Sequence, residues 1–161
     1  MEFLDVVNER DEIVGNASKK DVYERLLPHR IVHVLIFNDK GEMALQLRGN
    51  VSFCPHHWST AVGGHVQSGE SCEQAALREF EEELGTKAKI ELVYKDFYND
   101  SRDLKKFLYT FTCTFNGPFT PDPKDVDRIE FFTVDKIRAM IDAGEKFHPE
   151  LLFLLEKHFG F

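Results

Sequence analysis

The pattern of apolar and polar positions predicts a mixture of strands and helices along the whole chain. Residues 3–17 form two short apolar runs on either side of the polar segment 8–12, which is typical of a β-hairpin. Residues 31–37 are an almost unbroken apolar run, which indicates a strand covered on both faces. Further strands are expected at residues 42–48, 58–62, 89–96, 107–115 and 129–134. Helices are expected at residues 19–27, 71–84, 135–143 and from 149 towards the end of the chain.

The helix expected at residues 71–84 is amphipathic. Ala76, Leu77, Phe80 and Leu84 recur at helical spacing, so we expect all four side chains to face a core.

Two more helices are expected near the C-terminal end of the chain. Asp135 is the expected N-cap of the first, and Pro149 is the expected first residue of the second. Strands and helices do not alternate as regular βαβ units, so the pattern alone predicts an α+β or mixed fold. Without a repeat, a low-complexity run or a linker, residues 1–161 are expected to form a single domain.

Composition and charge narrow the classes of function. The net charge is −8 with no basic stripe, which argues against a nucleic acid polymer as the partner. No segment approaches the length of a membrane span, and the N-terminus does not resemble a secretory signal, so no membrane partner is expected. The three cysteines have no paired or metal-binding spacing and are interpreted as reduced thiols of a cytoplasmic protein.

Three glutamates carry the clearest chemical signal. Glu79, Glu82 and Glu83 stand at i, i+3 and i+4, so their carboxylates project from one side of the helix. Each like-charged pair costs about 0.2–0.5 kcal/mol on an isolated helix. Either solvent or a cation relieves that repulsion, and the alternatives are a solvated acidic face or a site for Mg²⁺ or Mn²⁺, which prefer oxygen ligands.

The glutamates stand in a specific frame. The frame runs Gly64, five residues, Glu70, seven residues, Arg78-Glu79-Phe80-Glu81-Glu82-Glu83-Leu84-Gly85. It resembles the Nudix box, the signature of the Nudix hydrolase family, and departs from it only at Thr86, where an aliphatic residue is usual. The resemblance implies an α/β/α sandwich with a mixed β-sheet between helices. It also implies a pyrophosphatase-type hydrolase that cleaves a diphosphate linkage in a nucleoside diphosphate or related small molecule by water attack at phosphorus.

Roles for the box residues follow from the resemblance. Glu79, Glu82 and Glu83 match the metal ligands, with the carbonyl of Gly64 or its neighbour Gly63 as a further ligand. Glu79 is either a ligand, the general base, or both. Arg78 is counted with the catalytic set.

Residues outside these ligands complete the expected site. Glu70 and Arg78 match the structural salt bridge of the box, which holds the turn against the helix. Arg48, at the end of a strand, is a candidate for a substrate phosphate, with a surface ion pair as the alternative. Asp125, after the proline-rich segment, is a candidate for substrate or metal contact from outside the box, as is Asp127.

The resemblance extends to the isopentenyl-diphosphate-isomerase-like branch of the family. It is carried by residues 5–15, Pro28-His29-Arg30 and residues 58–67. The isomerases carry a thiol just before the glycine-histidine pair, where this chain has Gly63. The missing thiol, together with the intact set Arg78, Glu79, Glu82 and Glu83, favours hydrolysis over isomerisation. The complete carboxylate set also disfavours a ligand sensor without turnover. The oligomeric state is left open, with a homodimer through the edge of the N-terminal hairpin as one alternative.

Overall fold

The computed structural model describes all 161 residues. The strands are β1 Phe3–Val7, β2 Ile13–Ser18, β3 His29–Phe37, β4 Met43–Arg48, β5 Trp58–Thr60, β6 Val62–His65, β7 Glu91–Asn99, β8 Lys105–Thr114 and β9 Val126–Phe132. The helices are α1 Lys19–Glu24, α2 Cys72–Leu84, α3 Val134–Asp142 and α4 Pro149–His158. None of these helices has the length and apolar character that a membrane crossing needs.

Seven strands form one mixed sheet with β3 at its centre. Strand order is β5-β4-β3-β8-β7, with β6 also pairing with β3 and β9 also pairing with β4. The β3–β8 pair is parallel, and the other pairs are antiparallel. Strand β3 pairs with β4 only at Phe37↔Met43 and with β6 over Ile31–Val34. The sheet therefore splits beside β3, because β4 and β6 occupy different lengths of the same edge.

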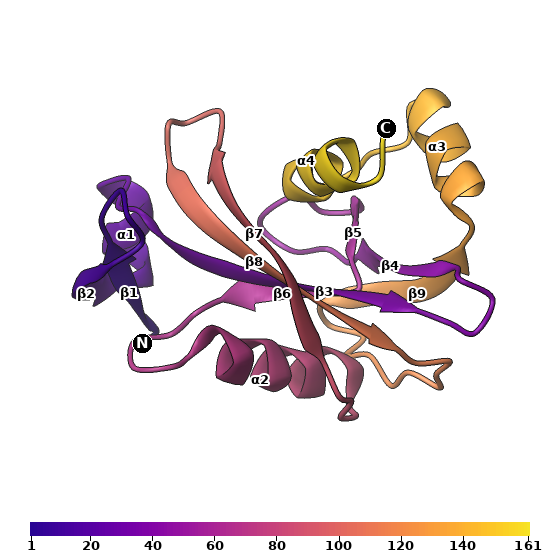
Figure 1. Cartoon of the computed structure of the whole chain (residues 1–161), viewed down its shortest axis with the longest axis horizontal. Coiled ribbons are helices and arrows are strands. Elements are labelled where there is room, and N and C mark those ends of the chain that lie inside the picture. The colour runs from indigo at the N-terminus through magenta and orange to yellow at the C-terminus, as the bar shows by residue number, and fades with distance from the viewer.

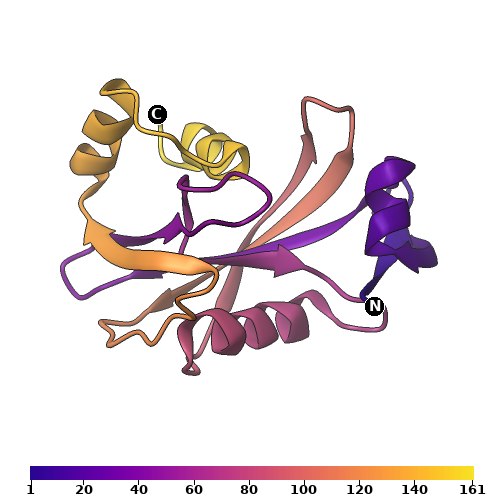
Figure 2. The ribbon, with the colours of Figure 1, turned by 180° about the vertical axis from the view of Figure 1, so that it is seen from behind.

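Helices cover both faces of this sheet. Helix α2 lies on one face, and α3 and α4 lie on the other (Figure 1). The reverse view shows the same layers, with α1 and the β1–β2 hairpin at the end of the sheet away from α3 (Figure 2). Phe80 and Leu84 of α2 are fully buried in the core on one side, and Leu151 of α4 is fully buried in the core on the other. The expected α/β/α sandwich is confirmed.

The N-terminal hairpin forms its own two-stranded sheet and docks on the main one. Strands β1 and β2 pair antiparallel, as expected for residues 3–17. Val7 N–H donates to the Pro28 carbonyl at 3.0 Å. Asp11, at the turn, accepts a hydrogen bond from Arg30 at 2.7 Å. The hairpin thereby fixes the start of β3, from which the site is built.

Three local expectations were wrong. The strand expected at 58–62 is two strands, because β5 pairs with β4 whereas β6 pairs with β3. Helix α3 is capped by Thr133, whose side chain accepts from Lys136 N–H, and Asp135 lies in the first turn, where its charge suits the helix dipole. Leu77 is 38% exposed, because only one side of α2 contacts the sheet and Leu77 lies at the margin of that side.

Candidate functional site

The split in the sheet opens into a cleft of about 560 Å³. Residues from β3, β4, β6, α1, α2, α4 and the loop between β4 and β5 line it. Gly64, Glu79 and Glu83 of the box lie in its wall, and so do Arg48 and Asp125. The cleft therefore gathers most of the residues that the sequence marks as functional.

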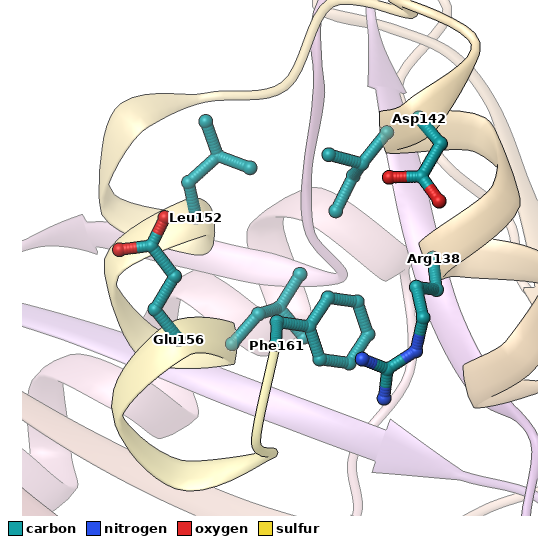
Figure 3. A pocket seen from close by; sticks show the side chains of 7 residues that line it. Arg138, Asp142, Leu152, Glu156 and Phe161 are labelled. Carbon is teal, nitrogen blue, oxygen red and sulfur yellow. The ribbon is translucent and has the colours of Figure 1, made fainter.

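A smaller pocket of about 210 Å³ lies elsewhere, between α3, α4 and the C-terminus (Figure 3). Its wall is partly apolar and includes the ring of Phe161, over which the Arg138 guanidinium lies at 4.4 Å from the ring centroid. None of the box residues reaches this pocket, so the larger cleft is the candidate site.

Helix α2 begins and ends at well-defined caps. Ser71 and Gln74 form a reciprocal capping box at its start, and Gly85 ends it in the left-handed conformation with φ +68°. These caps fix the register of the helix, so that Glu79 passes directly beneath β6. A Cβ added to Gly64 would lie 2.3 Å from the Glu79 carboxyl carbon, so any side chain there would have to displace the Glu79 carboxyl group.

Arg78 connects the glycine-rich turn to the helix. Its guanidinium donates to both carboxylate oxygens of Glu70, at 2.7 and 3.0 Å, and to the backbone carbonyl of His65 at 3.0 Å. It also donates to Glu79 at 2.8 Å and reaches Glu82 at 3.3 Å. This fork-to-fork geometry is the strong form of an ion pair. Arg78 thus holds the turn, the helix and one site carboxylate in a single arrangement.

Glu79 and Glu83 form a buried acid pair. Burial raises the pKa of Glu83 well above its usual 4.5, and repulsion from Glu79 adds to the rise, although hydrogen bonds from Gln46 and the Gly63 N–H oppose it. Burial also raises the pKa of Glu79, against the opposing contact with Arg78. When two carboxyl groups are buried next to each other, the ionisation of one makes the ionisation of the other less favourable. A cation placed between them would remove that penalty.

The third carboxylate of the expected cluster lies apart from this pair. The Glu82 side chain is 59% exposed, whereas that of Glu79 is 15% exposed, and Glu82 leans towards Arg78. As a result, no group of three His, Cys, Asp or Glu side chains is gathered closely enough to hold a metal ion. The buried acid pair beside Gly64 still suits a hard divalent cation, because its ligand atoms are oxygens and only Glu79 has a cationic partner, Arg78. Glu82 would join it through a change of its side-chain rotamer.

Comparison with known proteins decides the family. A family model described as the NUDIX domain matches residues 27–155. The chain belongs to the Nudix family. An uncharacterized Nudix hydrolase of Escherichia coli, YfcD, is 29% identical over 152 residues, which cover 94% of this chain and 83% of that protein. A Nudix hydrolase of Deinococcus radiodurans is 33% identical over 161 residues, which cover 97% of this chain and 93% of that protein.

A solved structure is similar over nearly the full length. The crystal structure of a Deinococcus radiodurans protein superposes with a TM-score of 0.83 at 30% identity, covering 97% of this chain and 98% of that one. This chain is accordingly a Nudix hydrolase, a class that generally uses divalent metal ions.

Of the candidate site residues outside the box of this Nudix hydrolase, Arg48 and Asp125 line the cleft and Asp127 does not. Arg48 lines it and donates through Nε to the Phe53 carbonyl at 3.1 Å, which leaves the outer nitrogens of its fork free of protein partners. Asp125 lines the rim, and its carbonyl accepts from the Gly49 N–H at 2.9 Å. Asp127 is exposed and lies outside the lining.

Sequence reasoning missed a second group of cleft residues. His33, Lys106 and Glu150 come from β3, β8 and α4 and form a buried ion network on the α4 side of the sheet. They are separated by up to 117 positions in the chain, so no local spacing pattern links them. The available signals were a histidine inside the apolar run 31–37, a lysine directly before the strand expected from residue 107, and a glutamate beside Pro149 at a helix start.

A histidine–tyrosine pair in the cleft was also missed. The Tyr23 hydroxyl lies 2.6 Å from His65 Nε2. Burial lowers the pKa of His65 to about 3 and raises that of Tyr23 to about 12. The neutral imidazole of His65 then accepts a hydrogen bond at Nε2 from the Tyr23 hydroxyl, which keeps its proton. This pair joins α1 to the glycine-rich turn of the box.

Proposed function

We propose that this Nudix hydrolase cleaves a diphosphate linkage in a nucleoside diphosphate-type or related small molecule by water attack at phosphorus, with Mg²⁺ or Mn²⁺ as the cofactor. The observation that carries the proposal is the buried pair Glu79–Glu83 beside Gly64 in the wall of the cleft. Both pKa values are raised by burial, so the pair is incomplete without a positive ligand.

The proposed ligands of the cation are Glu79, Glu82, Glu83 and the carbonyl of Gly64. When bound there, a divalent cation supplies Lewis acidity towards a phosphoryl oxygen and lowers the pKa of bound water. Glu79 stands beside Gly64 and serves as a ligand, as the acceptor of the water proton, or as both. Arg78 keeps the Glu79 carboxylate in place through the 2.8 Å hydrogen bond.

Other chain residues bind and position the substrate. Glu70 fixes the Arg78 fork through two hydrogen bonds, which is a structural role with no direct part in the reaction. The free nitrogens of Arg48 are suited to the oxygens of the diphosphate. Asp125 lines the cleft and is proposed to contact the remainder of the substrate.

The isomerase alternative is disfavoured by the cleft itself. None of the residues that line it is a cysteine. A Cβ added to Gly63, the position of the isomerase thiol, would lie 3.2 Å from His33 Nδ1 and 3.4 Å from Thr60 Oγ1. A side chain at this position would therefore pack tightly against His33 and Thr60. We propose that the chain shares the framework of the isomerase-like branch without its chemistry.

We further propose that residues 1–161 act as one domain, because the hairpin is hydrogen-bonded both to Pro28 and, through the Phe3 carbonyl, to Ser68 N–H at 2.8 Å. A cytoplasmic location is proposed from the three free cysteines. Pairing of a second copy along the exposed edge of β2 would make a homodimer.

The test is a panel of diphosphate compounds assayed for hydrolysis products with Mg²⁺ and with Mn²⁺. Glu82→Gln and Glu83→Gln should each reduce turnover on the best substrate by two or more orders of magnitude, about 3 kcal/mol, because a charge-stabilising group is lost. Glu81→Gln is the matched control, since Glu81 lies on the same helix, is exposed and contacts only Lys87 at 3.7 Å.

Three results would contradict the proposal. The first is near-normal turnover by Glu83→Gln. The second is metal-independent hydrolysis by the wild type. The third is double-bond migration in isopentenyl diphosphate without hydrolysis of any panel member.

A further inference from the structure

Lys106 is a buried cation in the wall of the cleft. The residue is only 3% exposed, yet it lines the cavity. Its ammonium donates one hydrogen bond, to Glu150 Oε2 at 2.9 Å. The next carboxylate oxygen, on Asp100, lies 3.8 Å away, which is too far for a hydrogen bond. Because an ammonium group has three donors, two of them have no acceptor in the protein.

Glu150 accepts only one hydrogen bond from the Lys106 ammonium. Its other oxygen, Oε1, accepts from His33 Nε2 at 2.8 Å. Burial acts to raise the pKa of Glu150, yet the hydrogen bond from His33 and the charges around it hold that pKa well below the usual range. A fully buried carboxyl group with a depressed pKa reports a positive local potential. Lys106 and His33 supply that potential, and Lys106 also lies 3.8 Å from Asp100, so what this wall offers a ligand is the two unused donors of the ammonium group.

This wall lies across the sheet from the acid pair. Glu79 and Glu83 belong to α2, whereas Glu150 belongs to α4, and the two helices cover opposite faces (Figure 1). The cleft reaches both groups through the split beside β3. A single ligand can consequently place one part near α2 and another part at Lys106.

We propose that Lys106 forms an anion-binding subsite that takes a second anionic group of the substrate, a phosphomonoester or a carboxylate, on the part of the molecule that is remote from the scissile diphosphate. The assignment rests on the proposed function, in which the diphosphate itself occupies the α2 side. The ligand oxygens accept the two spare ammonium hydrogens of Lys106. Arg102, whose guanidinium lies over Tyr23 and Phe53 at the cleft, stands beside this subsite.

Substrate pairs that differ only in the second anion provide the kinetic test. UDP-glucuronate against UDP-glucose tests a carboxylate, and coenzyme A against dephospho-coenzyme A tests a phosphomonoester. The wild type should prefer the charged member of at least one pair by about tenfold in kcat/KM, the effect of one hydrogen bond to a charged group. Lys106→Met should bring that ratio close to one, and Lys106→Arg should retain most of it.

Lys105→Met is the matched control. Lys105 is the next residue on β8, is 41% exposed at its side chain, and lies outside the cleft lining. Its substitution should leave the ratio unchanged. A role of Lys106 in folding alone would lower the rates for both members of a pair equally and leave the ratio unaltered, which would overturn the proposal. Absence of any preference in the wild type would also overturn it, whether or not the variants fold.

Binding without turnover separates this proposal from the hydrolase assignment. Inorganic phosphate and acetate are titrated calorimetrically into the metal-free protein in EDTA. Lys106→Met should weaken binding of the preferred anion about tenfold relative to Lys105→Met. If the diphosphate panel shows no hydrolysis but this difference persists, the hydrolase mechanism fails and the subsite stands. Active hydrolysis with equal anion binding by the two variants would remove the subsite and leave the hydrolase.

Discussion

Two groups of buried carboxyls line the same cleft and are balanced in opposite ways. On the α2 side, Glu79 and Glu83 face each other, and burial raises both pKa values. On the α4 side, Glu150 lies between His33 and Lys106, and its pKa is depressed although it is more deeply buried. The difference lies in the partners, because burial alone acts in the same direction on both groups.

This contrast separates a carboxyl pair that is prepared for a ligand, Glu79 and Glu83, from a carboxylate whose own oxygens are satisfied within the protein, Glu150. The acid pair has few donors and no cation of its own except the Arg78 contact at one edge. The Glu150 carboxylate has a donor on each oxygen and lies in the first turn of α4, where the helix dipole also favours negative charge. The first group should therefore respond to added metal, and the second should contribute to stability without it.

The largest expected effect is on the stability of the α4 group. Glu150→Ala should lower the free energy of unfolding by about 3–5 kcal/mol, because it leaves Lys106 and His33 buried without their shared carboxylate. Urea denaturation followed by circular dichroism measures the change. Glu156→Ala, an exposed substitution on the same helix, should change it by less than about 0.5 kcal/mol. If Glu150→Ala and Glu156→Ala lowered the free energy of unfolding equally, the Glu150 carboxylate would not have the stabilising role given to it here.

The next effect tests the geometry of the α2 group. Gly64→Ala places a methyl group against the Glu79 carboxyl and must displace it, so kcat should fall by at least about 100-fold. Gly15→Ala is the control, because nothing lies within 4 Å of the added methyl group. Initial rates on the best panel substrate provide the measurement. An active Gly64→Ala enzyme would mean that the position of Glu79 is unimportant.

The two groups should also respond to pH in opposite directions. In the metal-free protein, folded Glu83 keeps its proton above the usual pKa of 4.5 while the unfolded chain loses it, so stability should fall as pH rises above about 4.5, by up to about 1.4 kcal/mol per pH unit for one proton. The Glu150 contribution has the other sign. It is present above about pH 4.5 and is lost as pH falls through the depressed pKa.

Urea denaturation at a series of pH values in EDTA measures both trends. Glu83→Gln should flatten the dependence of the free energy of unfolding on pH above pH 4.5. It should leave unchanged the loss of stability at low pH that comes from Glu150. An unchanged slope above that pH in the variant would show that the acid pair is not its source. Added Mg²⁺ should stabilise the wild type more as pH rises, because the cation competes with the proton for the pair.

The smallest effect concerns the exposed member of the box. Glu82→Gln should change the free energy of unfolding by less than about 0.5 kcal/mol, since Glu82 is largely solvated and its contact with Arg78 is a surface i,i+4 pair. The same variant is expected to lose turnover, so stability and activity should separate at this residue. A loss of several kcal/mol would place Glu82 with the structural carboxylates instead.

Local sequence signals predicted the parts of the molecule that depend on neighbouring residues. The hairpin at 3–17, the buried strand around 31–37 and helix α2 follow from periodicity and turn residues. The errors have local physical reasons. At α3 the hydroxyl of Thr133 takes the cap in place of Asp135. At 58–62 the change of partner strand at Ala61 divides one apolar run into two strands.

By itself, the sequence pattern determined an α+β or mixed fold, and the resemblance to the Nudix box supplied the layered sandwich. It also determined the capped helix α2 and the frame that holds Glu70, Arg78 and the site glutamates, because these features depend on spacings within one helix and one turn. Only the tertiary structure decided which carboxylates lie together, and it joined Glu79 to Glu83 while leaving Glu82 in solvent. It also brought β3, β8 and α4 together around Glu150. Burial and charge balance act through space, so a contact across 117 positions leaves no periodic trace in the chain.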